Sequence, residues 1–387
     1  MFLKFLVIFI AVYATHAFSS EANIEMRTGL DYYPDAKKNE MAGRGDLRLN
    51  WKENLLRGRA YIGVRAETID TPWGKNSEIE LREANLTWQI DQSTLRIGRQ
   101  QIAWGRADAF RLLDTVNPLR YPDAFYMVAA DARIPLWMVQ WDGQVSVWEW
   151  QLFAGPDRRL NAVDPSFPLL QPAFNNSLET PKGRSKRGVT GARLSRQMGE
   201  LDLGLYWLNG WNHEPLWQPL SDGDFDMGSA RRYLWGASAD WPAGPGIIRA
   251  EWVYSETDTF NTDFSYIPQR QEQALVGFDW EYGHLFFSPQ LYWEATTPSS
   301  YNTTNYSQRY VSLLGQYKFL QNRGNMRLFW WHQIGGDEEW LSLKLGYEWD
   351  KNLELRTEVD WFYVHRNAEP SAFDELDRIK LEAVWRF

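Results

Sequence analysis

The sequence predicts an all-β fold: a single up-and-down antiparallel transmembrane β-barrel of about eighteen strands, or sixteen. The first observation behind this prediction is the alternation within the final segment, 375–387. One set of its side chains is apolar and suits hydrocarbon, namely Ile379, Leu381, Ala383, Trp385 and Phe387. The set between them is charged and suits a wet lumen, namely Arg378, Lys380, Glu382 and Arg386. This two-residue period is typical of a strand in the wall of an outer-membrane barrel.

The second observation is the N-terminal segment, residues 1–17. It begins with Lys4 after three residues, continues through an apolar stretch at 5–13 and closes on a small residue, Ala17. A membrane anchor would need about 20 apolar residues, so this shorter segment indicates a cleaved secretory signal peptide. We therefore expect residues 18–387 to form one barrel domain.

The third observation is the aromatic content. The chain has 22 Trp, 18 Tyr and 20 Phe, many at the ends of alternating segments, where the interfacial girdles of a barrel lie. The net charge of -9 argues against a nucleic-acid partner. The chain contains no cysteine, which excludes a disulfide framework and a thiolate metal site.

Eighteen alternating segments can be followed along the chain. We expect strands near 22–33, 44–52, 56–69, 79–90, 93–104, 134–141, 144–154, 188–197, 200–210, 231–241, 246–256, 271–282, 284–296, 307–320, 324–334, 339–349, 353–364 and 375–387. Tight connections rich in Gly, Asn, Asp or Pro alternate with longer polar ones. The tight ones are 53–55, 91–92, 142–143, 198–199, 242–245, 283, 321–323 and 350–352. This alternation predicts an integral outer-membrane protein with both termini periplasmic.

Residues between the lipid-facing positions must point into the lumen, so we expect a charged inner wall. The candidate lumenal charges are Glu25, Arg27, Arg59, Arg65, Glu354, Arg356, Glu358, Asp360, Arg378, Lys380 and Glu382. Two roles remain open for them. Opposite charges can pair across neighbouring strands, which stabilises a sheet by about 0.2 to 1 kcal/mol each. Alternatively, they can line a path for a charged or polar solute.

The long connection at 105–133 mixes charged residues with apolar ones such as Phe110, Leu112 and Leu113. This mixture predicts a loop that folds into the barrel or caps it. Because sixteen to eighteen strands leave room for an aqueous channel, such a loop would constrict the lumen. The candidate pore or constriction residues are Arg99, Gln100, Arg106, Asp108, Arg111, Asp114, Asn117 and Arg133. A second long connection, 155–187, is rich in proline and basic residues, which suits contact with anionic lipopolysaccharide as well as capture of a substrate.

At the first of these loops the sequence resembles a known family. The matching residues are Gly98-Arg99-Gln100, Ala103-Trp104-Gly105, Asp114, Val116-Asn117-Pro118 and Arg133-Ile134-Pro135. They resemble the signature of the alginate-export-like outer-membrane barrels and of a related uncharacterised barrel family. The resemblance implies a monomeric porin-like barrel whose chain turns inward after Trp104, with charged side chains along a conduit for a polar or anionic solute. Alginate itself is disfavoured, because the expected wall is also acidic. Taken singly, Trp104 could equally be a girdle residue and Asn117 a turn residue.

The residues give little support to an enzyme. His16 belongs to the signal peptide, and the other histidines, His213, His284, His332 and His365, are dispersed along the chain. A lipase-like barrel would need Ser, His and an orienting partner on adjacent lipid-facing strands. His332 shares its expected outward face with Trp330, which suits an interfacial histidine. The chain has no Gly-x-Ser-x-Gly or His-Glu-x-x-His motif and no phosphate loop, so we expect no catalysis, cofactor or metal.

These observations predict an outer-membrane channel for a polar or charged solute, either porin-like or the outlet of an exporter. The alternatives are a non-conducting structural or adhesion barrel and, least favoured, a barrel lipid hydrolase. The expected partners are outer-membrane lipid and lipopolysaccharide, the barrel-assembly machinery, an unidentified polar or anionic solute and, for an exporter, its periplasmic components.

Overall fold

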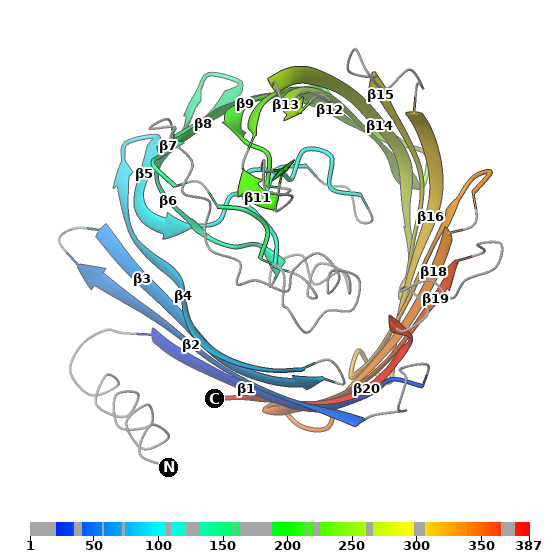
Figure 1. Ribbon diagram of the computed structural model, residues 1–387. Helices are drawn as coiled ribbons and strands as arrows, with labels where there is room; N and C mark the ends of the chain where they lie inside the picture. The colour runs from blue at the N-terminus through cyan, green and yellow to red at the C-terminus, as the bar shows by residue number, and fades with distance from the viewer. Residues whose placement is uncertain are drawn as a thin grey trace.

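Eighteen strands form one antiparallel sheet that closes on itself (Figure 1). The computed structural model describes residues 21–34, 41–55, 58–71, 74–105, 110–120, 132–157, 159–162, 188–213, 216–219, 225–228, 230–260, 266–297, 306–336, 338–364 and 376–387. The first strand pairs with the second on one side and with the last on the other, which closes the ring. The predicted up-and-down barrel of eighteen strands is therefore confirmed.

Each barrel strand overlaps one predicted segment. The first nine are β1 (Glu21–Tyr32), β2 (Met41–Leu55), β3 (Gly58–Thr71), β4 (Gly74–Ile90), β5 (Ser93–Gln100), β6 (Leu136–Val145), β7 (Trp148–Gly155), β8 (Val189–Met198) and β9 (Leu201–Trp211). The other nine are β12 (Arg231–Ala243), β13 (Gly246–Phe260), β14 (Tyr266–Tyr282), β15 (Leu285–Thr297), β16 (Tyr306–Phe319), β17 (Gly324–Gln333), β18 (Glu338–Glu348), β19 (Leu353–Val364) and β20 (Arg378–Arg386). Both β1 and β20 reach the end of the barrel that carries the tight turns.

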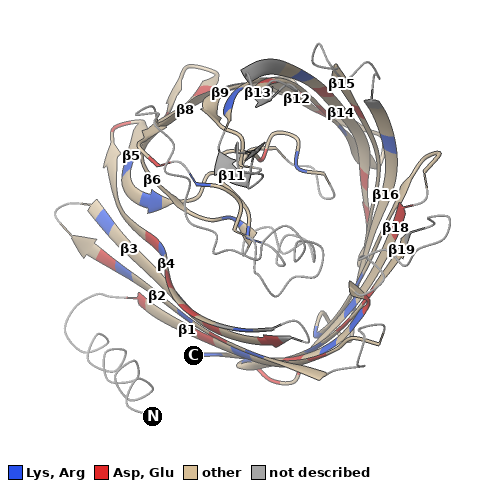
Figure 2. Cartoon of the chain, in the orientation of Figure 1, with Lys and Arg blue, Asp and Glu red and all other residues tan. Residues whose placement is uncertain are grey.

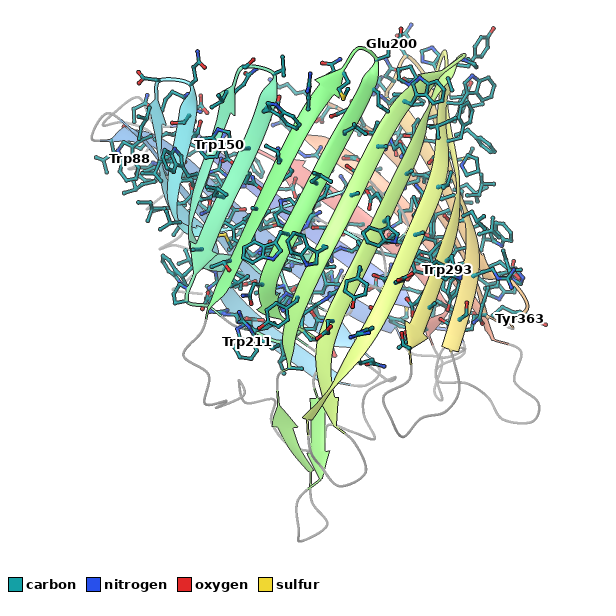
Figure 3. The ribbon with its side chains drawn as sticks, turned by 90° about the horizontal axis from the view of Figure 1, so that it is seen from above. Trp88, Trp150, Glu200, Trp211, Trp293 and Tyr363 are labelled. Carbon is teal, nitrogen blue, oxygen red and sulfur yellow. The ribbon has the colours of Figure 1, made fainter. Side chains whose placement is uncertain are left out.

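Three expected boundaries are wrong. The strand expected over 93–104 ends at Gln100, where the chain leaves the wall. The turn expected at 142–143 lies beyond Val145, because both residues stay in the ladder with β5 and β7. The turn expected at 53–55 is also misplaced, because all three residues belong to β2 and pair with β3. In addition, the expected connection 211–230 contains a separate hairpin of β10 (Leu216–Pro219) and β11 (Phe225–Gly228), which the strand prediction did not include. This hairpin projects beyond the ends of the neighbouring strands, in green in Figure 3.

The two faces of the wall differ as the alternation predicts. Large apolar side chains such as Leu205, Trp235 and Leu381 are exposed on the outside, where a bilayer would contact them. Aromatic side chains gather toward both ends of the wall, with Trp88 and Trp150 toward the tight turns and with Trp211 and Tyr363 toward the opposite end (Figure 3). Among the described residues, no helix has the length and apolar character needed to cross a membrane.

The inner face has two unlike halves. Charged residues concentrate on β1 to β4 and on β18 to β20, as Figure 2 shows in blue and red, and many of their side chains are buried. Over β6 to β15 the inner face also carries buried apolar residues, among them Leu136, Tyr206, Leu234, Val253 and Leu275. We call these the charged half and the apolar half of the inner wall.

Candidate functional site

The chain turns inward directly after β5, and two glycines permit this path. Gly98 has φ +135°, and a Cβ there would lie 2.1 Å from the carbonyl oxygen of Ala84. Gly105 has φ +75°, and a Cβ there would lie 2.9 Å from the carboxylate of Glu251. Because a larger residue at either place would be strained and would clash, both positions need glycine: Gly98 within β5, just before the chain leaves the wall, and Gly105 in the loop that follows. We call the described parts of the following connection, 101–105 and 110–120, the inner loop.

The inner loop packs on the apolar half of the wall. Its side chains Ile102, Trp104, Leu112, Leu113 and Val116 join one buried cluster with residues of β6, β7, β8, β9 and β12 to β15. Burial of such side chains contributes about 1.5 to 3 kcal/mol each, which holds the loop against the wall. Figure 1 shows the cyan loop segment inside the ring of strands. The predicted inward loop is therefore confirmed for its described part.

Trp104 lies inside the barrel, so the alternative interpretation as a girdle tryptophan is wrong. It is only 2% exposed, and its ring meets Phe153 and Tyr206 edge-on, with centroids 5.4 and 5.5 Å apart. Its indole N–H donates to Oε1 of Gln151 at 2.6 Å. Trp104 thus anchors the start of the loop to β7 and β9.

Two of the predicted pore residues are buried and form hydrogen bonds with backbone groups. Asn117 is 1% exposed; its Oδ1 accepts from the backbone N–H of Ile102 at 2.8 Å, and its Nδ2 donates to the carbonyl of Ile134 at 2.9 Å. Asn117 therefore ties together the beginning, middle and end of the connection. Gln100 is fully buried and donates through Nε2 to the carbonyl of Met138 at 3.2 Å. Their burial excludes both side chains from the surface of the lumen.

The other predicted constriction residues form a polar edge on the loop. Asp114 accepts from the guanidinium groups of Arg111 and Arg133, with N···O distances of 2.7 and 2.6 Å. Arg99 pairs with Glu80 of β4 at 3.0 Å. These contacts turn the polar side of the loop toward the charged half of the wall. Arg106 and Asp108 lie outside the described residues.

Further contacts join this edge to the wall. Arg82 on β4 donates to the carbonyl of Arg133 at 2.6 Å, and Arg120 of the loop lies 2.6 Å from the carboxylate of Glu67 on β3. The sequence interpretation missed Arg82, and it counted Arg120 among the charges of the long connection without making it a candidate site residue. A break in the alternation at Arg82-Glu83 was the available signal, because consecutive charged residues in a membrane strand indicate a bulge.

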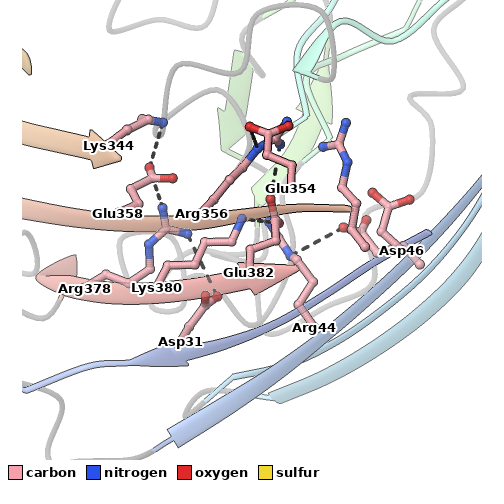
Figure 4. A network of polar contacts seen from close by, with 12 residues as sticks. Asp31, Arg44, Asp46, Lys344, Glu354, Arg356, Glu358, Arg378, Lys380 and Glu382 are labelled. Atoms are coloured by element: carbon pink, nitrogen blue, oxygen red, sulfur yellow. Dashed lines mark hydrogen bonds and ion pairs between the residues drawn. The ribbon is translucent and has the colours of Figure 1, made fainter. Parts of the chain in front are cut away.

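The predicted lumenal charges of β19 and β20 are largely paired (Figure 4). Arg378 is buried and contacts Asp360 at 2.7 Å, Glu358 at 2.8 Å and, across the closing seam, Asp31 at 3.9 Å. Lys380 contacts Glu382 at 2.6 Å. Because these charges sit away from bulk water, pairing is what makes their burial tolerable.

The network continues across the seam into the first strands. Glu354 accepts from both Arg356 and Arg386 at 2.8 Å, and Arg386 also meets Glu25 of β1 at 3.1 Å. Glu25 in turn accepts from Arg27. On β3, Arg65 bridges Asp46 of β2 and Glu67 at 2.9 and 2.7 Å. Ion pairing, partly across neighbouring strands and partly between residues two apart on one strand, therefore describes these residues. Arg59 differs, because it has no ion pair among the described residues.

His213 joins three connections beyond the ends of the strands. Its Nδ1 lies 2.9 Å from the carbonyl oxygen of Arg159, and its Nε2 lies 3.2 Å from those of Thr115 and Val116. Burial lowers the pKa of His213 to about 4, outweighing the carbonyl contacts, and the charge of Arg232 acts in the same direction as burial. The ring is therefore neutral at pH 7 and holds the inner loop to its neighbours. His332 stacks on Trp330, with ring centroids 6.1 Å apart.

A family model whose description is "Protein of unknown function (DUF1302)" matches residues 21–361, which is most of the chain and nearly all of the barrel. The chain belongs to the DUF1302 family. No member of the curated proteins matches it significantly. The alginate-export part of the resemblance therefore stays a prediction, while the DUF1302 assignment stands on the greater part of the sequence.

Solved structures of bacterial barrel proteins share the fold of this DUF1302 protein. OccAB3 of Acinetobacter baumannii is 11% identical, with a TM-score of 0.55 over 95% of this chain and 99% of that chain. OccK5 (OpdH) of Pseudomonas aeruginosa is 12% identical, with a TM-score of 0.55 over 95% and 98%. OccK2 (OpdF) of the same species, solved in complex with glucuronate, is 11% identical, with a TM-score of 0.53 over 95% and 98%. At these identities the likeness shows an outer-membrane-type barrel fold.

Proposed function

We propose that this DUF1302 protein is an outer-membrane channel that passes small polar or charged solutes along the charged half of its lumen. One observation carries the proposal. The inner loop packs on the apolar half, and the connection that contains it carries a polar group of Arg111, Asp114 and Arg133. Arg133 of this group and Arg120 of the same connection contact Arg82 on β4 and Glu67 on β3 of the charged half, respectively. The loop therefore narrows the lumen from one side and leaves a polar surface on the other, as in a selective pore.

The shared fold with solved barrels, among them the outer membrane protein OpdK of Pseudomonas aeruginosa, supports this proposal. The OccK2 structure contains glucuronate, a small hydroxylated anion, which makes solutes of that size reasonable first probes. In the proposed orientation, both termini and the tight turns are periplasmic, and the long connections face outward toward lipopolysaccharide. The protein would enter the membrane through the barrel-assembly machinery. We propose no catalytic role for it.

Planar-bilayer recording of the purified protein tests conduction. We expect steady single-channel steps from the full chain and larger steps after deletion of residues 106–131, because the loop would no longer narrow the lumen. A deletion of 299–304, in the connection between β15 and β16, is a control of a different connection and should leave the conductance close to that of the full chain. Silence of both the full chain and the 106–131 deletion would contradict the channel and favour a structural or adhesion barrel.

The direction of transport requires a second measurement. Liposomes that contain the protein should take up a small solute as readily as they release it if the protein is a porin-like channel, because diffusion through an open pore is symmetric. An exporter outlet would instead remain closed until its periplasmic components were added. Flux in both directions without added components would therefore argue against the exporter.

A further inference from the structure

A polar groove opens on the inner wall at the tight-turn end of β2 to β5. It is an open groove with a volume of about 720 Å³, and its lining side chains include Lys52, Arg59, Glu83, Asn85, Thr87 and Arg96. This volume is within the range of about 300 to 1,000 Å³ that small-molecule sites occupy. The inner loop does not line it, so the groove is separate from the constriction.

The cations of this groove differ from those elsewhere on the charged half. Arg59 is exposed to the groove and has no ion pair among the described residues. Arg96 donates to the neutral Oγ1 of Thr87 at 3.3 Å. Lys52 lies 3.8 Å from Glu21, and both side chains are at least half exposed, so solvent weakens that pair. By contrast, Arg378 is buried against carboxylates. The groove therefore presents guanidinium groups whose charge the protein has not neutralised by direct contact.

A β-bulge supplies the single carboxylate of the groove. The register of β3 against β4 pairs Gly63 with Glu83 and then Val64 with Leu81, which leaves Arg82 without an opposite residue. Both Arg82 and Glu83 consequently face the lumen. Arg82 reaches the base of the inner loop, whereas Glu83 lines the groove, where Asn85 donates to it at 3.4 Å. One carboxylate thus stands among three cations and several neutral hydrogen-bonding groups.

We propose that this groove binds a small hydroxylated monocarboxylate. The guanidinium groups of Arg59 and Arg96 would hold the carboxylate, since charge-assisted bonds to Arg are the strongest available there. The side chains of Asn85 and Thr87 would bind hydroxyl groups, and Glu83 would accept a hydrogen bond from another. A neutral sugar would leave the two guanidinium groups without an anion, and a dicarboxylate would bring a second negative charge toward Glu83.

The proposal deepens the proposed channel function, but binding can be measured without conduction. Isothermal titration calorimetry on the purified full chain in detergent micelles would use D-gluconate, neutral D-glucose and the dianion galactarate as probes. We expect gluconate to bind at least tenfold more tightly than either of the others. The double variant Arg59→Gln/Arg96→Gln should lose at least tenfold in gluconate affinity, because it removes both carboxylate ligands.

A matched control removes the same charge elsewhere at the same end of the barrel. Lys318 and Lys351 are exposed and lie outside the groove, so Lys318→Gln/Lys351→Gln should leave gluconate binding unchanged within about twofold. Glu83→Gln should narrow the preference for gluconate over galactarate by about tenfold. Equal affinities for gluconate and glucose would overturn the proposal that the groove binds a monocarboxylate. An equal loss of gluconate affinity in both double variants would also overturn it. If the protein bound gluconate but gave no single-channel current in the bilayer, the result would contradict the proposed channel and not the proposed binding groove.

Discussion

The charged and apolar halves of the inner wall stabilise their buried side chains in different ways. On the charged half, buried groups such as Arg378 and Glu358 satisfy one another across strands. On the apolar half, Leu234 and Val253 cannot remain facing water, and the inner loop covers them with Leu113 and its neighbours. The comparison teaches that the apolar residues of the wall determine where the described part of the loop packs, whereas the charged residues of the other half satisfy one another within the wall.

The two halves also differ in how well they tolerate contact with water. A paired charge on the wall stays compatible with water in the lumen, whereas a buried apolar patch gains free energy only when another segment covers it. Leu113 is fully buried and fits closely over Gly236, where a Cβ would lie 2.3 Å from it. The loop is therefore fitted to one place on the wall, and its polar edge follows from that fit.

The largest expected effect comes from breaking the charged half at Arg378. Arg378→Ala leaves the buried carboxylates of Asp360 and Glu358 without their shared partner, which should cost about 3 to 5 kcal/mol. Urea unfolding of the folded barrel in micelles measures the loss. Arg270→Ala is the control, because Arg270 is 62% exposed in its pair with Glu256, and it should cost about 0 to 1 kcal/mol. Similar losses in the two variants would contradict the importance of the buried network.

The packing of the inner loop on the apolar half can be weakened at Leu113. Leu113→Ala removes a fully buried side chain and should weaken loop docking by about 2 to 5 kcal/mol. The chain has no cysteine, so a single Val116→Cys substitution reports undocking through the rate of thiol labelling, since Val116 is fully buried. We expect labelling to accelerate. In the matched control, Leu320→Ala at an exposed turn position, the rate should stay unchanged.

A smaller effect is expected at Asn117. Asn117→Ala removes two bonds that tie the loop to Ile102 and Ile134 and leaves a buried N–H and a buried carbonyl unpaired. This should cost about 1 to 3 kcal/mol of docking free energy. The same thiol probe measures the cost, with Asn325→Ala on exposed β17 as the control. A labelling rate as slow as that of the parent would show that the apolar contacts alone position the loop.

The smallest expected effect is a pH dependence of loop docking that arises from His213. Because burial lowers its pKa to about 4 from 6.5, the undocked loop takes up the proton first as the pH falls. Docking is therefore fully favoured above pH 6.5, weakens between pH 6.5 and 4, and should lose about 1.4 kcal/mol at pH 5.5. Labelling of Val116→Cys, normalised to an exposed Lys351→Cys reference, should accelerate over this range. His213→Gln does not titrate there, so an identical slope in that variant would assign the dependence to another group.

The candidate site could be anticipated only in part. The inward loop and the roles of Arg111, Asp114 and Arg133 as a polar group followed from the mixture of charged and apolar residues in one long connection. Gln100 and Asn117 were pore candidates because they belong to the motif around the long connection, yet both are buried and hydrogen-bond to backbone groups. Whether a polar side chain faces water or a backbone group depends on packing between distant segments.

Local patterns in the sequence determined the eighteen strands, their inward and outward faces and most of their turns, because the two-residue period and the turn residues act over a few positions. Only the tertiary structure decided that Arg378 meets Asp31 across the seam, that a bulge turns both Arg82 and Glu83 inward, and that the loop covers the apolar half. Each of these depends on register and closure, which join residues that are tens to hundreds of positions apart. A period of two specifies a face of the sheet, but it does not specify which residues stand opposite.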